Sequence, residues 1–258
     1  MPSTPLLIYG ANGYTGALIA QLAVARGLRP ILAGRGRTAL AAVAGPLGLE
    51  QRVFALEDTA VLDAGLAGAR VVLHCAGPFA HTARQMAGAC FRTHTHYLDI
   101  TGEIAVFEAL AARDAEARAA GVMLLPGAGF DVVPSDCLAA HLKRRLPSAT
   151  SLALGFQVLG RVSRGTATTA VENVARGGMV RRAGKLVAVP AAYKTRVIDL
   201  GRGPVTASTI PWGDVATAFH STGIPNIEVY TVLSATTRRL MAASGYLRPL
   251  LGSYAVQR

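Results

Sequence analysis

The chain has 258 residues, of which 51% are hydrophobic and 16% are charged. This composition excludes a disordered, collagen-like or mucin-like chain, and a chain of this length can bury roughly 70% of its unfolded surface without help from disulfides or metals. The formal net charge is +11, and nearly all of the excess follows residue 130, where 16 residues are basic and 6 are acidic. An anionic partner would therefore act on the second half, unless that half is simply a solvated basic surface.

The chain shows no sign of export or of a metal site. Three irregularly spaced cysteines at 75, 90 and 137 form neither a disulfide framework nor a zinc site, so a reducing, cytoplasmic setting is expected. No signal peptide is visible, and no run of about 18 apolar residues predicts a spanning helix. His94 and His96 would share one face of a strand, but no third ligand lies at a useful spacing, so we expect no metal.

The first 136 residues alternate short apolar strands with Ala-rich helices. We expect strands at residues 6–9, 30–33, 53–56, 69–75, 97–100 and 121–125. We expect helices at residues 15–26, 37–48 (broken at Gly45 and Pro46), 82–93 and 104–120. This βαβα order predicts an α/β domain with a doubly wound parallel sheet.

After Asp136 the pattern changes, and strands dominate. We expect a helix over 137–146, strands over 151–159, 186–189, 195–200, 205–210 and 227–233, and a helix over 167–176. This favours an α+β domain with a mainly antiparallel sheet, so we divide the chain into residues 1–146 and 147–258.

The last residues have an unusual composition. Residues 238–258 are rich in Leu and Arg and contain no closing strand, so the second domain is expected to be incomplete at its C-terminal end. This segment would be a core helix or, alternatively, a helix that makes weak contact with a membrane surface.

The strongest motif spans residues 10–16, which follow the first strand and open the first helix. Gly10 permits a tight turn, Gly13 lets the backbone approach a pyrophosphate, and Gly16 lets helix and strand pack closely. The helix N-terminus then presents N–H groups and a partial positive charge to that anion. The motif predicts a dinucleotide site; the alternative is a plain glycine-rich turn.

The end of the second expected strand indicates which dinucleotide binds. An NAD site would place Asp or Glu there for the ribose 2′-hydroxyl, but this chain has Arg35 and Arg37 instead. Guanidinium groups suit a 2′-phosphate because they donate paired, charge-assisted hydrogen bonds. We therefore expect NADP(H), held first by Arg35 and then by Arg37; the alternative is a surface Arg pair in an Arg-rich chain.

A turn of small residues follows the fourth strand. Cys75, Gly77 and Pro78 lie in it, and such a turn can run under the pyrophosphate and the nicotinamide ribose. Cys75 is expected to be a packed small side chain there rather than a nucleophile, because no neighbouring base or helix N-terminus marks it.

Acidic residues follow the fifth and sixth strands. Asp99, Glu103 and Asp131 could serve as acid, base or substrate anchor, or could instead cap helices and fix loops. Asp136 is expected, with Ser135, to cap the next helix. Other catalytic templates are absent from the sequence: it has no Tyr-x-x-x-Lys pair, no G-x-S-x-G elbow and no P-loop lysine motif. The basic second half lacks the interleaved aromatic residues of a nucleic-acid platform.

The motifs together resemble a known family. GANGYTG, LAGRGR, VVLHCAGPF, CFRTHTHYLDITGE and GAGFDVVPSD occur in the order and spacing of the saccharopine dehydrogenase-like oxidoreductases. The likeness continues through GTATTAVENVARGGMVRRAGKL and IPWGDVATAFHSTGIPNIEVY, and is strongest for the branch that includes trans-acting enoyl reductases of lipid synthesis.

The resemblance implies an NADP-binding Rossmann domain followed by a second α+β domain. Matched residue by residue, it implies a nucleotide loop of Gly10, Asn12, Gly13, Tyr14, Thr15 and Gly16, the phosphate-side Arg35, and the turn at Gly77 and Pro78. It also implies that Asp99, Glu103, Asp131 and Asp136 line the cleft.

These observations predict an enzyme of lipid metabolism, an NADP(H)-dependent oxidoreductase. It would transfer hydride to or from a C=C bond of an enoyl substrate or a C=N bond. Substrate-binding candidates are Lys194, Trp212 and Ser221, with a small-molecule or carrier-bound acyl substrate and no nucleic acid. A homodimer is left open as a further association. The alternative is a non-catalytic NADP-binding regulatory or scaffold protein, because no proton-donor dyad is recognisable.

Overall fold

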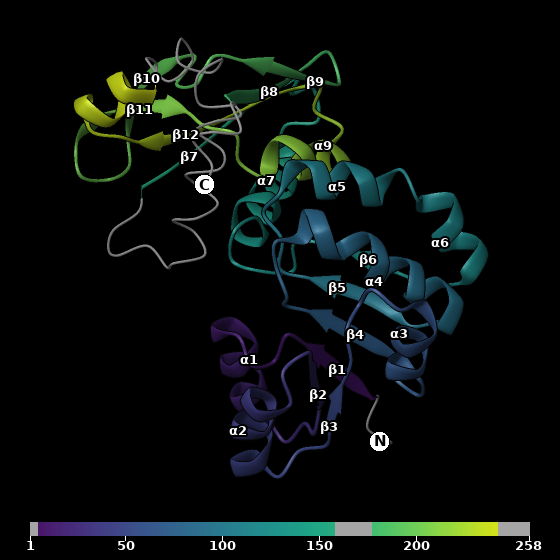
Figure 1. Cartoon of the computed structure of the whole chain (residues 1–258). Helices are drawn as coiled ribbons and strands as arrows, with labels where there is room; N and C mark the ends of the chain where they lie inside the picture. The colour runs from purple at the N-terminus through teal and green to yellow at the C-terminus, as the bar shows by residue number, and fades with distance from the viewer. Residues whose placement is uncertain (1–4, 158–176, 242–258) are drawn as a thin grey trace, which may run out of the picture. The chain divides into compact units, whose positions relative to one another are not determined.

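The computed structural model describes residues 5–157 and 177–241, and it divides into two compact units, residues 1–133 and 134–258 (Figure 1). The sequence-based boundary lies after helix α7 (Val133–Arg145), whereas this division lies at its start. The expected helix over 167–176 lies outside the described residues, as do residues 242–258 of the expected C-terminal helix.

The first unit is built on a six-stranded parallel sheet. Its strand order is β3-β2-β1-β4-β5-β6, so the direction of winding reverses between β1 and β4. The strands are β1 (Leu6–Tyr9), β2 (Ile31–Gly34), β3 (Gln51–Val53), β4 (Val71–His74), β5 (His96–Asp99) and β6 (Leu124–Leu125). This is the predicted doubly wound sheet, whose ligands bind at the reversal point on the carboxyl edge.

Helices cover both faces of this sheet (Figure 1). They are α1 (Tyr14–Ala25), α2 (Arg37–Leu47), α3 (Thr59–Leu66), α4 (Phe79–Thr93), α5 (Ile104–Ala111) and α6 (Asp114–Ala120). Along β1, Ile8 packs with the core residues of α1 and α2, while Leu7 and Tyr9 pack with those of α3, α4 and α5. The two-residue alternation of the strand thus divides the core into two layers.

Three helices differ from the sequence prediction. α2 is continuous through Gly45 and Pro46, so the predicted break is wrong; Pro46 lies in the last turn, so its missing N–H removes a hydrogen bond only at the end of the helix. The expected single helix over 104–120 is two helices, because the chain turns at Ala112 and Arg113 before α6 begins. Helix α3 was not expected at all.

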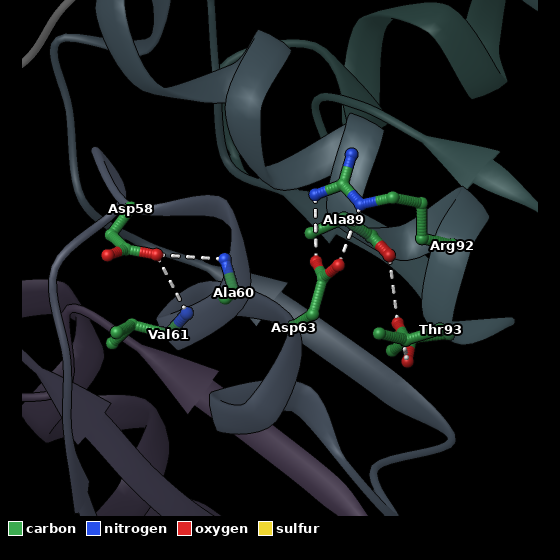
Figure 2. A network of polar contacts seen from close by, with 8 residues as sticks. Asp58, Ala60, Val61, Asp63, Ala89, Arg92 and Thr93 are labelled. Atoms are coloured by element: carbon green, nitrogen blue, oxygen red, sulfur yellow. Dashed lines mark hydrogen bonds and ion pairs between the residues drawn. The ribbon is translucent and has the colours of Figure 1, made fainter.

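Helix α3 is short, and polar contacts hold it in place (Figure 2). Asp58 caps its N-terminus, accepting hydrogen bonds from the N–H groups of Ala60 (2.9 Å) and Val61 (3.1 Å). Asp63 pairs with both Nε and Nη2 of Arg92 on α4, each at 2.7 Å. An N-terminal cap and a bidentate ion pair thus stabilise an eight-residue helix that could not form by itself.

The second unit has a separate, mainly antiparallel sheet, as predicted. Its order is β10-β11-β12-β8-β9, with β7 pairing in parallel to β12. The strands are β7 (Ser151–Phe156), β8 (Gly178–Arg182), β9 (Lys185–Val189), β10 (Thr195–Asp199), β11 (Pro204–Thr209) and β12 (Asn226–Val232), and helix α9 (Asp214–Thr222) packs against β12. Within the described ranges, no helix is long and apolar enough to cross a membrane.

Candidate functional site

The turn between β1 and α1 leaves room only for glycine at two positions. Gly10 has φ +79°, and a Cβ there would lie 2.8 Å from the backbone nitrogen of Ala76. A Cβ on Gly16 would collide with the Gly10 carbonyl oxygen. The loop is therefore pressed against the turn that follows β4, as a pyrophosphate-binding loop requires.

The N-terminus of α1 is suited to an anion. Its N-cap is Gly13, which supplies no side-chain cap, and no acidic residue lies in the first turn. Tyr14 and Thr15, the first two helical residues, are exposed. The helix dipole and its terminal N–H groups are thus open to a phosphate.

The carboxyl end of β2 lies beside this loop. A Cβ on Gly34 would lie 2.8 Å from Oδ1 of Asn12, so the Asn12 side chain lies against the last residue of β2. Arg35 and Arg37 follow, and both are exposed. Burial raises the pKa of Tyr9 to about 12, and the charge of Arg35 opposes this shift. The predicted phosphate-binding residues are thus brought to one corner of the sheet.

Asp99 lies at the end of β5 and is completely buried. Its Oδ2 accepts from the Tyr97 hydroxyl (2.6 Å), and its Oδ1 accepts from the N–H groups of Thr101 (2.9 Å) and Gly127 (2.7 Å). Burial raises the pKa of Asp99, and these hydrogen bonds oppose that rise. Asp99 therefore ties the loop after β5 to the loop after β6, which favours loop-fixing over catalysis.

Glu103 ties the same loop to a third one. Its carboxylate accepts from the N–H groups of Phe79 (2.8 Å) and Ala80 (2.9 Å), the first two residues of α4. The N-cap position of α4 is Pro78, whose side chain has no atom that can accept a hydrogen bond. Glu103 thus caps a helix that begins 24 residues earlier, and holds the turn at Gly77 and Pro78 in place.

Asp131 is the candidate acid that remains exposed. A Cβ on Gly102 would lie 3.0 Å from Asp131 Oδ2, so the carboxyl group lies over the loop after β5. Burial of that group raises the pKa of Asp131. An exposed residue with a partly desolvated carboxyl group is suited to hold or donate a proton.

Two neighbouring side chains at the end of β4 are packed rather than reactive. Burial raises the pKa of the Cys75 thiol to about 12, as expected for a packed small side chain. His74, which sequence reasoning did not single out, has no exposed surface, and its Nε2 lies 2.9 Å from the Thr82 hydroxyl. That hydroxyl donates to the Ala76 carbonyl oxygen (2.8 Å), so it accepts the proton of His74 Nε2. No motif in the sequence marks His74, and it is distinguished only by its burial among aromatic rings in the structure.

The three substrate-binding candidates lie in the second unit, and each contacts a different residue. Lys194 pairs with Glu228 on β12. Trp212 lies against Phe156, with ring centroids 4.9 Å apart. Ser221 on α9 donates to Asp136 Oδ1 (2.9 Å).

The predicted capping role of Asp136 is wrong. Helix α7 already begins at Val133, so Asp136 lies in its first turn and links α7 to α9. Helices commonly begin next to a proline, and here Pro134 occupies the second helical position. In the described part of the chain, no group of three His, Cys, Asp or Glu side chains could hold a metal ion.

Comparison with known proteins agrees with this geometry. Residues 6–125 match the model of the saccharopine dehydrogenase NADP-binding domain, in agreement with the NADP(H) expected from Arg35. A trans-acting enoyl reductase of Mycobacterium leprae is 34% identical over 149 residues, which is 55% of this chain and 36% of that protein. The Mycobacterium ulcerans enzyme of the same name is 31% identical over 148 residues, or 54% and 35%. The match thus covers only about a third of these relatives.

A solved structure shows the same fold over both units. Apo saccharopine dehydrogenase (L-Glu forming) from Saccharomyces cerevisiae superposes with a TM-score of 0.68 at 14% identity, covering 93% of this chain and 57% of that one. The parallel sheet and the glycine loop agree with the family match. Residues 6–125 of this chain are thus similar to the saccharopine dehydrogenase NADP-binding domain in both sequence and fold.

Proposed function

We propose that the chain is the NADPH-binding part of an oxidoreductase that reduces a carbon–carbon double bond of an acyl substrate. The observation that carries the cofactor choice is the carboxyl end of β2, where exposed Arg35 stands in place of an acid. A ribose 2′-phosphate needs cationic donors at this position, and a carboxylate would repel it.

The residues fit the cofactor in three places. The loop at Gly10 and Gly16 and the N-terminus of α1 would hold the pyrophosphate, and Arg35 with Arg37 would hold the 2′-phosphate. The turn at Gly77 and Pro78, held by Glu103, would lie under the nicotinamide ribose. When bound, NADPH supplies the hydride.

The names of the mycobacterial relatives support an enoyl substrate. Reduction of a C=C bond adds a hydride to one carbon and a proton to the other, and Asp131 is our candidate for holding that proton. We propose Lys194, Trp212 and Ser221 as substrate contacts, and a carrier-bound acyl chain as the substrate form. A C=N substrate would accept hydride and proton in the same way.

Nicotinamide fluorescence during titration with NADPH and NADH tests the cofactor. We expect NADPH to bind at least about tenfold more tightly, a difference of about 1.4 kcal/mol. Arg35→Ala should remove this preference by weakening NADPH alone. Arg26→Ala removes an exposed guanidinium at the other end of α1 and should leave the preference for NADPH unchanged. Equal binding of both nucleotides to the unchanged protein would contradict the proposal.

The alternative is a non-catalytic NADP-binding protein. It is favoured by the engagement of Asp99 and Glu103 in loop contacts, which leaves few acids for proton transfer. Loss of NADPH absorbance in single turnovers with enoyl thioesters and cyclic imines distinguishes the two. Oxidation with an enoyl thioester supports the reductase, whereas binding without oxidation by any substrate favours the alternative.

A further inference from the structure

One surface of the first unit has an unusual charge. The first 49 residues contain four arginines and no Asp, Glu or Lys, and the first acid of the chain is Glu50. This segment forms α1 and α2, and α1 itself carries no charged residue. We define the α1–α2 surface by its exposed apolar residues Tyr14, Leu18, Leu22 and Leu28 and by Arg26, Arg29, Arg35 and Arg37.

Helix α1 presents its large side chains to solvent. Gly16, Ala20 and Ala23 are its buried residues, whereas Leu18 is 47% exposed and Leu22 is 52% exposed. Residues four apart lie on one face of a helix, so these leucines continue a line that begins at Tyr14. A helix with small residues inside and leucines outside has an apolar face that is not used by its own domain.

Arginines lie at both ends of this apolar line. Arg26 and Arg29 follow the C-terminus of α1, and Arg35 and Arg37 follow β2 at the carboxyl edge of the sheet, where α1 begins. The partner of this surface must therefore be anionic and must bury leucines. We propose that the α1–α2 surface binds an anionic lipid bilayer.

Charge argues against the other occupants. A second copy of this surface would place arginines against arginines. The second half of the chain is not complementary to it either, because residues 131–258 have an excess of ten basic residues. An acidic protein would normally find hydrogen-bonding side chains, yet the polar residues of α1 are only Tyr14, Thr15 and Gln21. A bilayer needs only apolar burial and attraction between cations and phosphates.

The sequence offered a membrane contact over residues 238–258 only as an alternative to a core helix, and most of that segment lies outside the described residues. The α1–α2 surface shares Arg35 and Arg37 with the proposed cofactor site, but the proposal does not depend on the proposed activity, because Leu18, Leu22 and Arg26, which the test changes, are not among the residues proposed to hold the cofactor. Binding should be weak and reversible, because only a few apolar side chains would enter the interface.

Co-sedimentation of the full chain with lipid vesicles tests the proposal. We expect binding to phosphatidylcholine vesicles that contain phosphatidylglycerol, none to pure phosphatidylcholine, and release at high salt. Leu18→Ser/Leu22→Ser should lower partitioning about tenfold. Arg26→Gln should lower it about fivefold without altering any apolar contact.

Helix α7 offers a matched control. Leu138 (53% exposed) and Leu142 (47% exposed) have the same spacing and exposure on a helix of the second unit. Leu138→Ser/Leu142→Ser should bind vesicles like the unchanged protein. Absence of binding to anionic vesicles at low salt would overturn the proposal, as would an equal loss in both double variants. A dimer that the Leu18/Leu22 substitutions dissociate would show instead that a second copy covers this surface.

Discussion

At the residue scale, the surroundings of three similar acids give them different roles. Asp99 is buried with hydrogen bonds to both oxygens, Glu103 caps α4, and only Asp131 is exposed. Because a substrate can approach only an accessible carboxyl group, Asp131 is the better candidate for proton transfer, and the other two position the loops around it.

His74 gives a residue-scale prediction about pH. Burial lowers the pKa of His74 from 6.5 to about 3, so between these values the unfolded chain binds a proton that the folded chain does not. Stability contributed by neutral His74 is therefore complete above pH 6.5 and is lost as the pH falls toward 3. His74→Phe keeps an aromatic ring in the cluster and should flatten the dependence by about 1.4 kcal/mol per pH unit.

Urea unfolding between pH 4 and 6 measures this slope. His81→Phe is the matched control, because His81 is exposed and lies in the first turn of α4. Equal slopes for the unchanged protein and His74→Phe would show that the buried imidazole is not the linked group.

At the element scale, α4 depends on a residue outside itself. Glu103→Ala leaves the N–H groups of Phe79 and Ala80 without their acceptor and should lower the free energy of unfolding by about 1–2 kcal/mol. NADPH affinity should fall as well, because the turn at Gly77 and Pro78 loses its support. Glu116→Ala removes an exposed pair with Arg113 and should change neither quantity comparably. If the Glu103→Ala protein is destabilised but its affinity for NADPH is unchanged, the cap on α4 does not support cofactor binding.

The glycines give a second element-scale prediction, with opposite signs. Gly16→Ala forces a Cβ against backbone atoms of Gly10 and Ala11 and should destabilise the protein by about 1–3 kcal/mol. A Cβ on Gly88, inside α4, would lie 3.4 Å from Nη1 of Arg92, which is an ordinary contact distance. Gly88→Ala should therefore stabilise the protein by about 0.5–1 kcal/mol. Thermal unfolding followed by circular dichroism measures both; a stabilised Gly16→Ala protein would contradict the close approach of α1 to the loop.

At the scale of the whole molecule, the two units have separate sheets and can be observed separately. The one tryptophan of the chain, Trp212, lies in the second unit, whereas the family match lies in the first. NADP⁺ at about 100 times its Kd should add about 2.7 kcal/mol to unfolding of the first unit. Far-ultraviolet circular dichroism follows the helices and strands of both units, so we expect only the first unit's part of that transition to shift, and the Trp212 fluorescence transition to stay in place. A parallel shift of both would show that the units unfold together.

The sequence by itself determined the order of the strands in the first unit, the glycine loop and Arg35, because each depends on neighbouring residues in the chain, but it missed α3 and the division of α5 from α6. It left the acids open, since their partners are distant: Asp99 binds Gly127, 28 residues away, and Glu103 binds Phe79, 24 residues away. Only the tertiary structure decided these contacts, because parallel strands bring loops that are remote in the sequence to one edge of the sheet. It likewise showed that α1 turns its leucines outward, since a helix that is apolar on all sides does not indicate which face its own sheet will cover.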